Sequence, residues 1–264
     1  MTRRGIMGVF AALAVVVAGL AAVPANASHT SNGELLPDLQ TLEPADLTIG
    51  TVSGRKAVRL SNTIGNNHTG PLEVFPGTTD CDNDGVADNS RTAFQRIYRD
   101  ANGNGTFNRG IDPESRTVSA GCMIYHEEHS HWHFEGFSEY ALYRLDGQGR
   151  RGPLVGVSKK TSFCIGDFAG RQWALAGAPN TGYYGTCTRT STQGLSVGWA
   201  DIYQYYLEGQ SITLPLNTNR GWFCLVSTAD PENRLVETDN TDNTESIRFS
   251  LSGSRINARR GSSC

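Results

Sequence analysis

The sequence predicts a mostly β protein, with a β-sandwich-like core, long loops and few short helices, stabilised by disulfides. Three observations support this class. Short runs of β-branched and aromatic residues alternate with polar positions. Turn-forming clusters separate these runs, and the 264 residues include 30 Gly and 10 Pro. Few segments show the period of an amphipathic helix.

Several runs have the alternation and composition of strands. The predicted strands are Ala57–Leu60, Phe137–Tyr143, Tyr203–Leu207, Trp222–Ser227 and Ser246–Leu251. A further run, 92–100, fits either one helical turn or a strand. No linker or internal repeat divides the chain, so a single domain over residues 28–264 is expected.

Residues 1–27 have the features of an export signal. Arg3 and Arg4 precede an apolar run, and Ala25-Asn26-Ala27 forms an A-x-A cleavage site. A secreted protein is therefore expected. Removing the two arginines takes the formal net charge from −3 to −5. The mature chain has neither a basic patch for nucleic acid nor a later run that could span a membrane.

Six cysteines follow the signal, and none forms a C-x-x-C pair. An even number in an exported chain favours three disulfides over a thiolate metal site. Fifteen pairings are possible. Among them we favour Cys164–Cys187 and Cys224–Cys264, which leaves Cys81–Cys122.

The segment His129-Ser130-His131-Trp132-His133 is a candidate metal site, and His126 lies just upstream. In one extended strand, the three alternating imidazoles would point to the same face. Three nitrogen ligands leave a position for water or substrate, which is typical of catalytic metal sites. Imidazole suits Zn, Cu, Ni and Fe alike, so the spacing does not select the metal.

Two acidic loops are candidate calcium sites. In the first, Asp80, Asp82 and Asp84 alternate before Gly85, as in the first half of an EF-hand loop. An ion-free Asx turn explains the same residues equally well. The second loop, Glu237–Asn243, again spaces its oxygen ligands closely.

Four ordered motifs and a short N-terminal segment resemble the lysyl oxidase family. The histidines lie in His126–Tyr143, which is similar to the family's copper-binding segment. Residues 160–164 (KTSFC) resemble its Lys-x-Ser-Phe-Cys segment, and residues 193–203 (QGLSVGWADIY) its segment ending in Asp-x-Tyr. Residues 237–243 (ETDNTDN) resemble a Glu-x-Asp-x-x-Asn-Asn segment, and residues 36–39 (LPDL) a Pro-Asp-Leu start. Glu128 and Trp199 stand where animal members carry cysteines.

This resemblance implies a copper-dependent amine oxidase whose quinone forms from its own side chains. The precursors of lysine tyrosylquinone would be Lys160 and Tyr203, and O₂ would be the oxidant. The expected substrates are primary amines, including peptidyl lysine. The proton acceptor would be either Asp201, which shares a strand face with Tyr203, or His126.

The resemblance also implies a structural calcium site that joins the Pro-Asp-Leu segment to the late acidic loop. Its ligands would be Asp38, the Leu39 carbonyl, Glu237, Asp239, Asp242 and Asn243. An exported copper- or calcium-binding protein without enzymatic activity is the alternative function. A zinc hydrolase using Glu127 or Glu135 as base ranks last, because the chain has no H-E-x-x-H motif.

Overall fold

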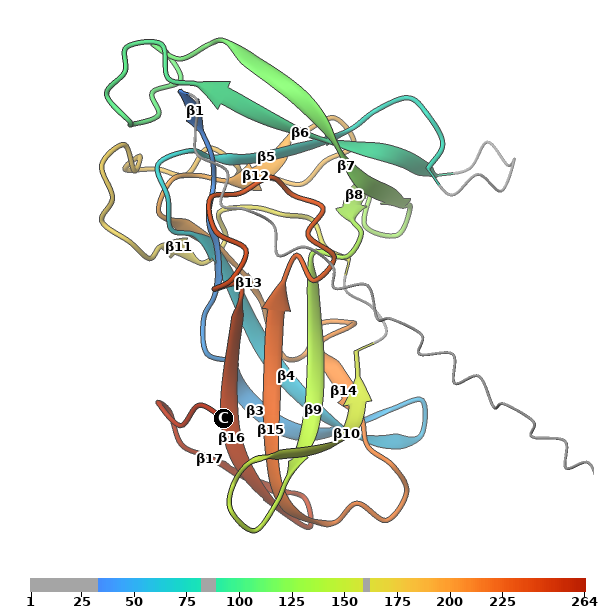
Figure 1. Cartoon of the computed structure of the whole chain (residues 1–264). Coiled ribbons are helices and arrows are strands. Elements are labelled where there is room, and N and C mark those ends of the chain that lie inside the picture. The colour runs from blue at the N-terminus through green and yellow to red at the C-terminus, as the bar shows by residue number, and fades with distance from the viewer. Residues whose placement is uncertain (1–32, 82–88, 159–161) are drawn as a thin grey trace, which may run out of the picture.

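A computed structural model describes residues 33–81, 89–158 and 162–264, and these residues form three antiparallel sheets without a helix (Figure 1). The predicted mostly β class is therefore confirmed. The signal-like residues 1–27 lie outside the described residues. Within the described ranges, no helix is long and apolar enough to cross a membrane.

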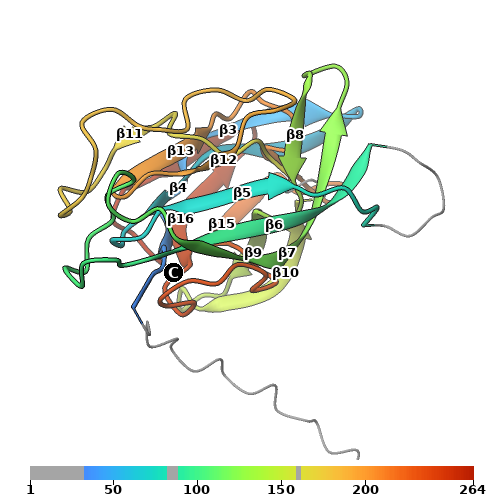
Figure 2. The same cartoon turned by 90° about the horizontal axis from the view of Figure 1, so that it is seen from above.

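The first sheet lies across the top of the molecule in Figure 1, and Figure 2 shows it from above. Its strands run in the order β12 (Gln193–Leu195), β5 (Leu72–Pro76), β6 (Ser90–Arg99), β7 (Ser115–His126) and β8 (His131–Phe134), with β1 (Glu34–Leu35) paired to β6. The ambiguous run 92–100 is thus mainly strand β6. Its pairing along nearly the whole of β7 favours the extended form.

The other two sheets form the sandwich. One has the order β10 (Arg151–Val157), β9 (Ser138–Leu145), β15 (Arg220–Ala229), β16 (Thr244–Ser252) and β17 (Arg255–Ala258). The other has the order β11 (Gly170–Arg171), β13 (Trp199–Tyr203), β4 (Arg55–Asn66) and β14 (Ser211–Thr213), with β2 (Leu39–Thr41) and β3 (Ala45–Val52) also paired to β4.

Two apolar cores hold the sheets together. Alternate residues of β4, β9, β15 and β16 meet between the two sandwich sheets, where Leu60, Tyr140, Phe223 and Phe249 are fully buried. A second core lies beneath the first sheet and includes Met123, Phe134, Phe137, Phe163 and Tyr203. The second core extends to the end of β13, so that strand brings Tyr203 next to the end of the β7–β8 hairpin.

One predicted strand is wrong beyond its first residue. The run Tyr203–Leu207 was expected to be extended, but β13 ends at Tyr203. The chain then turns, and the Leu207 amide donates to the Gln204 carbonyl at 2.9 Å. The alternation of bulky residues continues past Tyr203, but Tyr205 and Tyr206 are exposed because no sheet face lies beneath them. The other four predicted strands fall within or largely within β4, β9, β15 and β16.

The favoured disulfide pairing is confirmed. Its Cα–Cα distances are 5.6 Å for Cys81–Cys122, 6.2 Å for Cys164–Cys187 and 5.9 Å for Cys224–Cys264, all within the usual range of disulfides. No cysteine is left free. Three disulfides are consistent with an extracellular protein.

Candidate active site

The β7–β8 hairpin carries the histidine cluster. His126 ends β7 and pairs directly with His131, the first residue of β8. The four residues between them form a turn in which the His129 amide donates to the His126 carbonyl at 3.1 Å. Ser130 takes a left-handed conformation with φ 57°, which allows the chain to reverse so tightly.

This turn corrects the expectation that one strand presents all three alternating histidines. Only His131 and His133 lie on β8, and His129 belongs to the turn. The imidazoles still converge. His133 Nε2 lies 3.0 Å from His131 Nε2 and 3.3 Å from His129 Nδ1. His126 stacks on His133 with ring centroids 4.0 Å apart.

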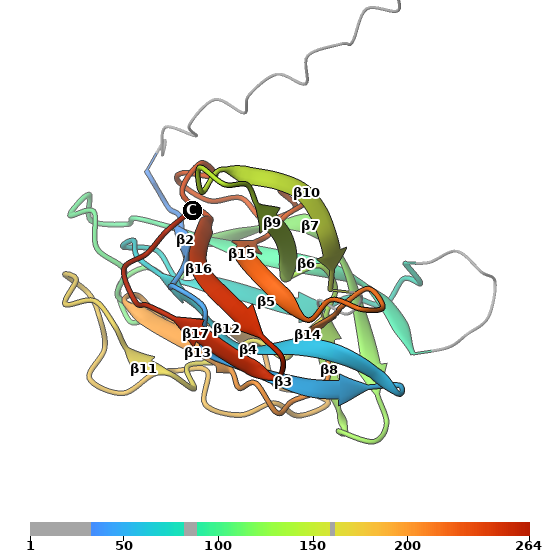
Figure 3. The ribbon, with the colours of Figure 1, turned by 90° about the horizontal axis from the view of Figure 1, so that it is seen from below.

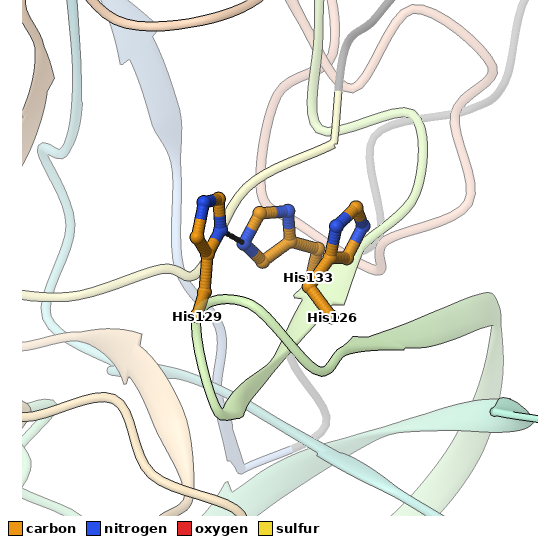
Figure 4. Close-up of side chains that lie close together, drawn as sticks. All are labelled: His126, His129 and His133. Carbon is orange, nitrogen blue, oxygen red and sulfur yellow. Dashed lines mark hydrogen bonds between the residues drawn. The ribbon is translucent and has the colours of Figure 1, made fainter.

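The cluster therefore offers two overlapping sets of ligands. One is the predicted set of His129, His131 and His133. The other replaces His131 by His126, and its three nitrogens lie within 4.8 Å of one another (Figure 4). Two nitrogens bound about 2.0–2.1 Å from one ion, at angles near 90–110°, lie roughly 2.9–3.4 Å apart. The separations measured from His133 Nε2 fit that requirement.

The electrostatics of His131 also suit a metal. Burial, and then the nearby His129, lower the pKa of His131. A lowered pKa favours the neutral imidazole, which is the form that binds metals. His133 is buried, whereas His129 is exposed, so the cluster is open to solvent on one side.

His129, His131, His133 and Tyr203 line one cavity of about 400 Å³. Its other walls come from residues 162–164, from Phe168 and from the segment after β13. The isolated bridge between Phe134 and Phe163 ties residues 162–164 to the end of β8. The disulfide Cys164–Cys187 also lies on the cavity wall. The histidines and Tyr203 thus face the same cavity, although His133 and Tyr203 are 70 positions apart in the sequence.

Tyr203 is held rigidly on the floor of this cavity. Its ring stacks on Phe163 with centroids 3.7 Å apart. Its hydroxyl lies 2.5 Å from Asp201 Oδ2 and 2.9 Å from the Cys164 carbonyl oxygen. Burial, followed by the charge of Asp201, raises the pKa of Tyr203 well above its usual value. The phenol is therefore protonated and donates to these acceptors.

Asp201 lies on the same strand face as Tyr203, as its position two residues away predicts. It is fully buried and accepts hydrogen bonds from the Gly166 amide at 2.9 Å and the Ile202 amide at 2.7 Å. Burial nevertheless raises its pKa to about 7. A carboxyl group that titrates near neutrality, next to the phenol, is a suitable proton acceptor. The other candidate acceptor, His126, is not among the described side chains that line the cavity.

Lys160 falls in 159–161, outside the described residues. Ser162, the next described residue, is buried and lines the cavity.

The two predicted calcium segments meet. Glu237 Oε2 accepts from the Leu39 amide at 2.8 Å, and Asp38 Oδ1 accepts from the Asp239 amide at 3.1 Å. Asp242 Oδ2 accepts from Gln40 Nε2 at 2.5 Å. The segments therefore join chain regions about two hundred residues apart.

The donor set there fits a calcium ion. Asn243 donates to Glu237 Oε1 at 2.7 Å, but its own Oδ1 is buried without a hydrogen-bond partner. Burial raises the pKa of Glu237 to about 8. Burial and then the charge of Asp242 raise the pKa of Asp38 to about 6. An orphaned oxygen beside crowded carboxyls is the chemistry that a hard cation satisfies.

The first acidic loop is only partly described. Asp80 Oδ1 accepts from Ser90 Oγ at 2.6 Å, whereas Asp82 and Asp84 lie outside the described residues.

Sequence reasoning missed a second acidic loop, the D-x-N-x-N-G segment that begins at Asp100, although its spacing was a readable signal. There, Asp100 accepts from the amides of residues 103–105, and the buried Asp112 accepts from two more. The loop is thus closed by its own hydrogen bonds.

The described residues combine an all-strand fold and three disulfides, which are consistent with an extracellular protein, with a histidine cluster whose geometry is compatible with a metal ion. The model of the lysyl oxidase family matches residues 97–261, which include the histidines, Tyr203 and the late acidic loop. The chain therefore belongs to the lysyl oxidase family, as its motifs predicted. A comparison with curated proteins gives no match.

Proposed function

We propose that the chain is a secreted, copper-dependent amine oxidase of the protein-lysine 6-oxidase type. Its substrates would be primary amines or peptidyl lysines, with O₂ as the second substrate. The observation that carries this proposal is the shared cavity, which joins the histidine cluster to Tyr203 and Asp201. Family membership supports a function of the lysyl oxidase type in general.

In this proposal His129, His131 and His133 hold copper, and Lys160 and Tyr203 are the precursors of lysine tyrosylquinone. When present, copper and the quinone would supply the oxidation of a primary amine to an aldehyde, with release of ammonia and reduction of O₂ to hydrogen peroxide. Zinc would not serve, because it has no redox chemistry.

The chain's own residues would bind the substrate and move its protons. Phe163, Phe168, Ile202 and Leu207 give the cavity an apolar lining that suits the aliphatic part of an amine. Asp201 would first accept the phenol proton of Tyr203, since the two oxygens are 2.5 Å apart. During turnover, the same carboxylate would accept a proton from the carbon atom that bears the amine nitrogen.

Peroxide release tests the proposed activity. Protein expressed with copper under air should produce hydrogen peroxide from an alkyl amine and from a lysine-containing peptide. Protein loaded with zinc in place of copper should produce none. Equal peroxide release from the copper and zinc forms would refute the proposal.

Replacing Asp201 with Asn should remove the proton acceptor and keep the fold. We expect kcat to fall about 10²–10⁴-fold, as is typical when a general base is lost. In the wild type only the ionised carboxylate accepts a proton, and the pKa of Asp201 is about 7. The activity should therefore rise from pH 6 to 8, and Asp201→Asn should lose this rise. A variant that keeps the wild-type pH profile would exclude Asp201 as the base.

We further propose that the oxygens of Asp38, Leu39, Glu237, Asp239, Asp242 and Asn243 hold calcium. Without an ion, the folded-state pKa values of Glu237 and Asp38 lie above their ordinary values. The ion-free folded protein thus binds more protons than the unfolded chain, and its stability falls as pH rises from about 4 to 8. Calcium needs the ionised carboxylates, so its affinity should rise over the same range.

Chelation should therefore lower the melting temperature, and more at pH 8 than at pH 5.5. We expect a decrease of roughly 5–10 °C at pH 8, which corresponds to a few kcal/mol for a domain of this size. Added calcium should reverse it, and Glu237→Gln should abolish the response. Identical melting curves with and without chelator at pH 8 would contradict the calcium site.

A further inference from the structure

A second large cavity, of about 690 Å³, lies on the outer face of the β10-β9-β15-β16-β17 sheet, and none of its lining residues is shared with the active-site cavity. Its polar and aromatic lining is Asp146, Gln148, Trp222, Arg248, Asn257, Arg259 and Ser262. The size is that of a site for a small ligand, within the usual range of about 300–1,000 Å³.

The strand register places the key side chains on one face. Cys224 pairs with Arg248, and Trp222 pairs with Ser250, which in turn pairs with Asn257. Side chains of directly paired residues, and of residues two apart, share a face. Trp222, Arg248 and Asn257 are therefore on the side opposite the sandwich core, to which Phe223 and Phe249 belong.

The C-terminal tail and the β9–β10 hairpin enclose this face from two sides. The C-terminal tail folds back over the sheet, held by the Cys224–Cys264 disulfide and by the Arg248 amide, which donates to the Ser262 carbonyl at 2.8 Å. The β9–β10 hairpin closes the other side, where Arg151 Nε donates to the Cys264 carbonyl at 2.7 Å. Figure 3 shows the C-terminus beside this hairpin.

Arg248 is the unusual member of the lining. Its Nε is buried and has no hydrogen-bond partner. Its guanidinium lies beneath the hairpin, because a Cβ placed on Gly149 would be 3.6 Å from Arg248 Nη1. A guanidinium whose buried Nε–H lacks an acceptor is poorly compensated inside the protein. Its terminal N–H groups can donate charge-assisted hydrogen bonds to an anionic ligand in the cavity. Asp146, the acidic residue of the lining, already forms an ion pair with Arg150 at 2.9 Å.

Trp222 is the second unusual member, because 54% of its surface is exposed. An exposed indole at the edge of a cavity offers a flat apolar platform. Arginines nearby would repel a cationic ligand, and amide and hydroxyl groups at Gln148, Asn257 and Ser262 offer hydrogen bonds to hydroxyl groups. The complementary ligand is a hydroxylated ring that carries a negative charge.

We propose that this cavity binds an acidic saccharide. The sugar ring stacks on Trp222, its carboxylate accepts hydrogen bonds from Arg248, and its hydroxyls contact Asn257 and Gln148. Such a site would attach the protein to an anionic polysaccharide while leaving the active-site cavity open. The proposal does not depend on the amine oxidase function.

Isothermal titration of the full mature chain tests the site with a glucuronate-containing disaccharide as probe. Cellobiose serves as the neutral control and uridine monophosphate as the nucleotide control. We expect the acidic disaccharide to bind at least about 10-fold more tightly than either, with Kd below about 1 mM. Trp222→Ala and Arg248→Gln should each weaken binding about 10-fold or more, whereas Arg171→Gln, an exposed arginine on another sheet, should not.

Trp222 is exposed, so its variant should fold normally even if Arg248→Gln does not. Amine oxidation by Trp222→Ala should equal that of the wild type. No detectable binding of the acidic disaccharide, equal binding of cellobiose, tighter binding of the nucleotide, or unchanged binding by Trp222→Ala would each overturn the proposal.

Discussion

Replacing Tyr203 with Phe should reduce amine oxidation by more than about 10⁴-fold, because the enzyme then has no phenol from which to form its cofactor. Quinone staining should disappear as well. Copper should remain bound at the wild-type stoichiometry, since Tyr203 is not among the proposed ligands. Phe fills nearly the same space against Phe163, so the fold should survive.

The lost hydroxyl leaves the buried Asp201 with one donor fewer, which should destabilise the protein by about 1–3 kcal/mol. Tyr140→Phe is the matched control. Tyr140 is also fully buried and its hydroxyl is hydrogen-bonded to Ser138 and Gln210, but it does not line the cavity. This control should keep both quinone and activity. Quinone staining in Tyr203→Phe would show that the cofactor has another origin.

Replacing His133 with Ala should have the second large effect. His133 Nε2 lies at the centre of the cluster and belongs to both possible ligand sets. We expect copper affinity to fall at least about 100-fold, with loss of peroxide production and of quinone formation. Metal content measured after dialysis, together with staining, checks the result.

A comparison of His126→Ala with His131→Ala distinguishes the two ligand sets. If copper binds to His129, His131 and His133, the His131 variant should lose the metal and the His126 variant should keep it. The reverse result would assign His126 in place of His131. Copper retained by His133→Ala would contradict both sets.

Local patterns in the sequence predicted much of this arrangement. The period-two spacing of Asp201 and Tyr203 correctly predicted that they share a strand face, and alternation correctly predicted four of the five strands. The period-two rule failed for His129, because a tight turn at Ser130 interrupts the strand. It also failed after Tyr203, where bulky residues alternate without a sheet to cover them.

Long-range packing could not be predicted in the same way. The stacking of Phe163 on Tyr203 and the contact of Tyr203 with the Cys164 carbonyl depend on how distant segments meet. No local pattern encodes such a meeting, and the family motifs alone indicated that these segments belong to one site. The cavity beside Trp222 likewise depends on the C-terminal tail folding over the sheet.

The most direct test of the proposed cofactor is peptide mapping of the mature chain after expression with copper under air. The expected result is one cross-linked peptide that contains both Lys160 and Tyr203, with the mass change of oxidation to a quinone. The same digest of Tyr203→Phe should lack it. Two separate, unmodified peptides from protein fully loaded with copper would contradict the amine oxidase function.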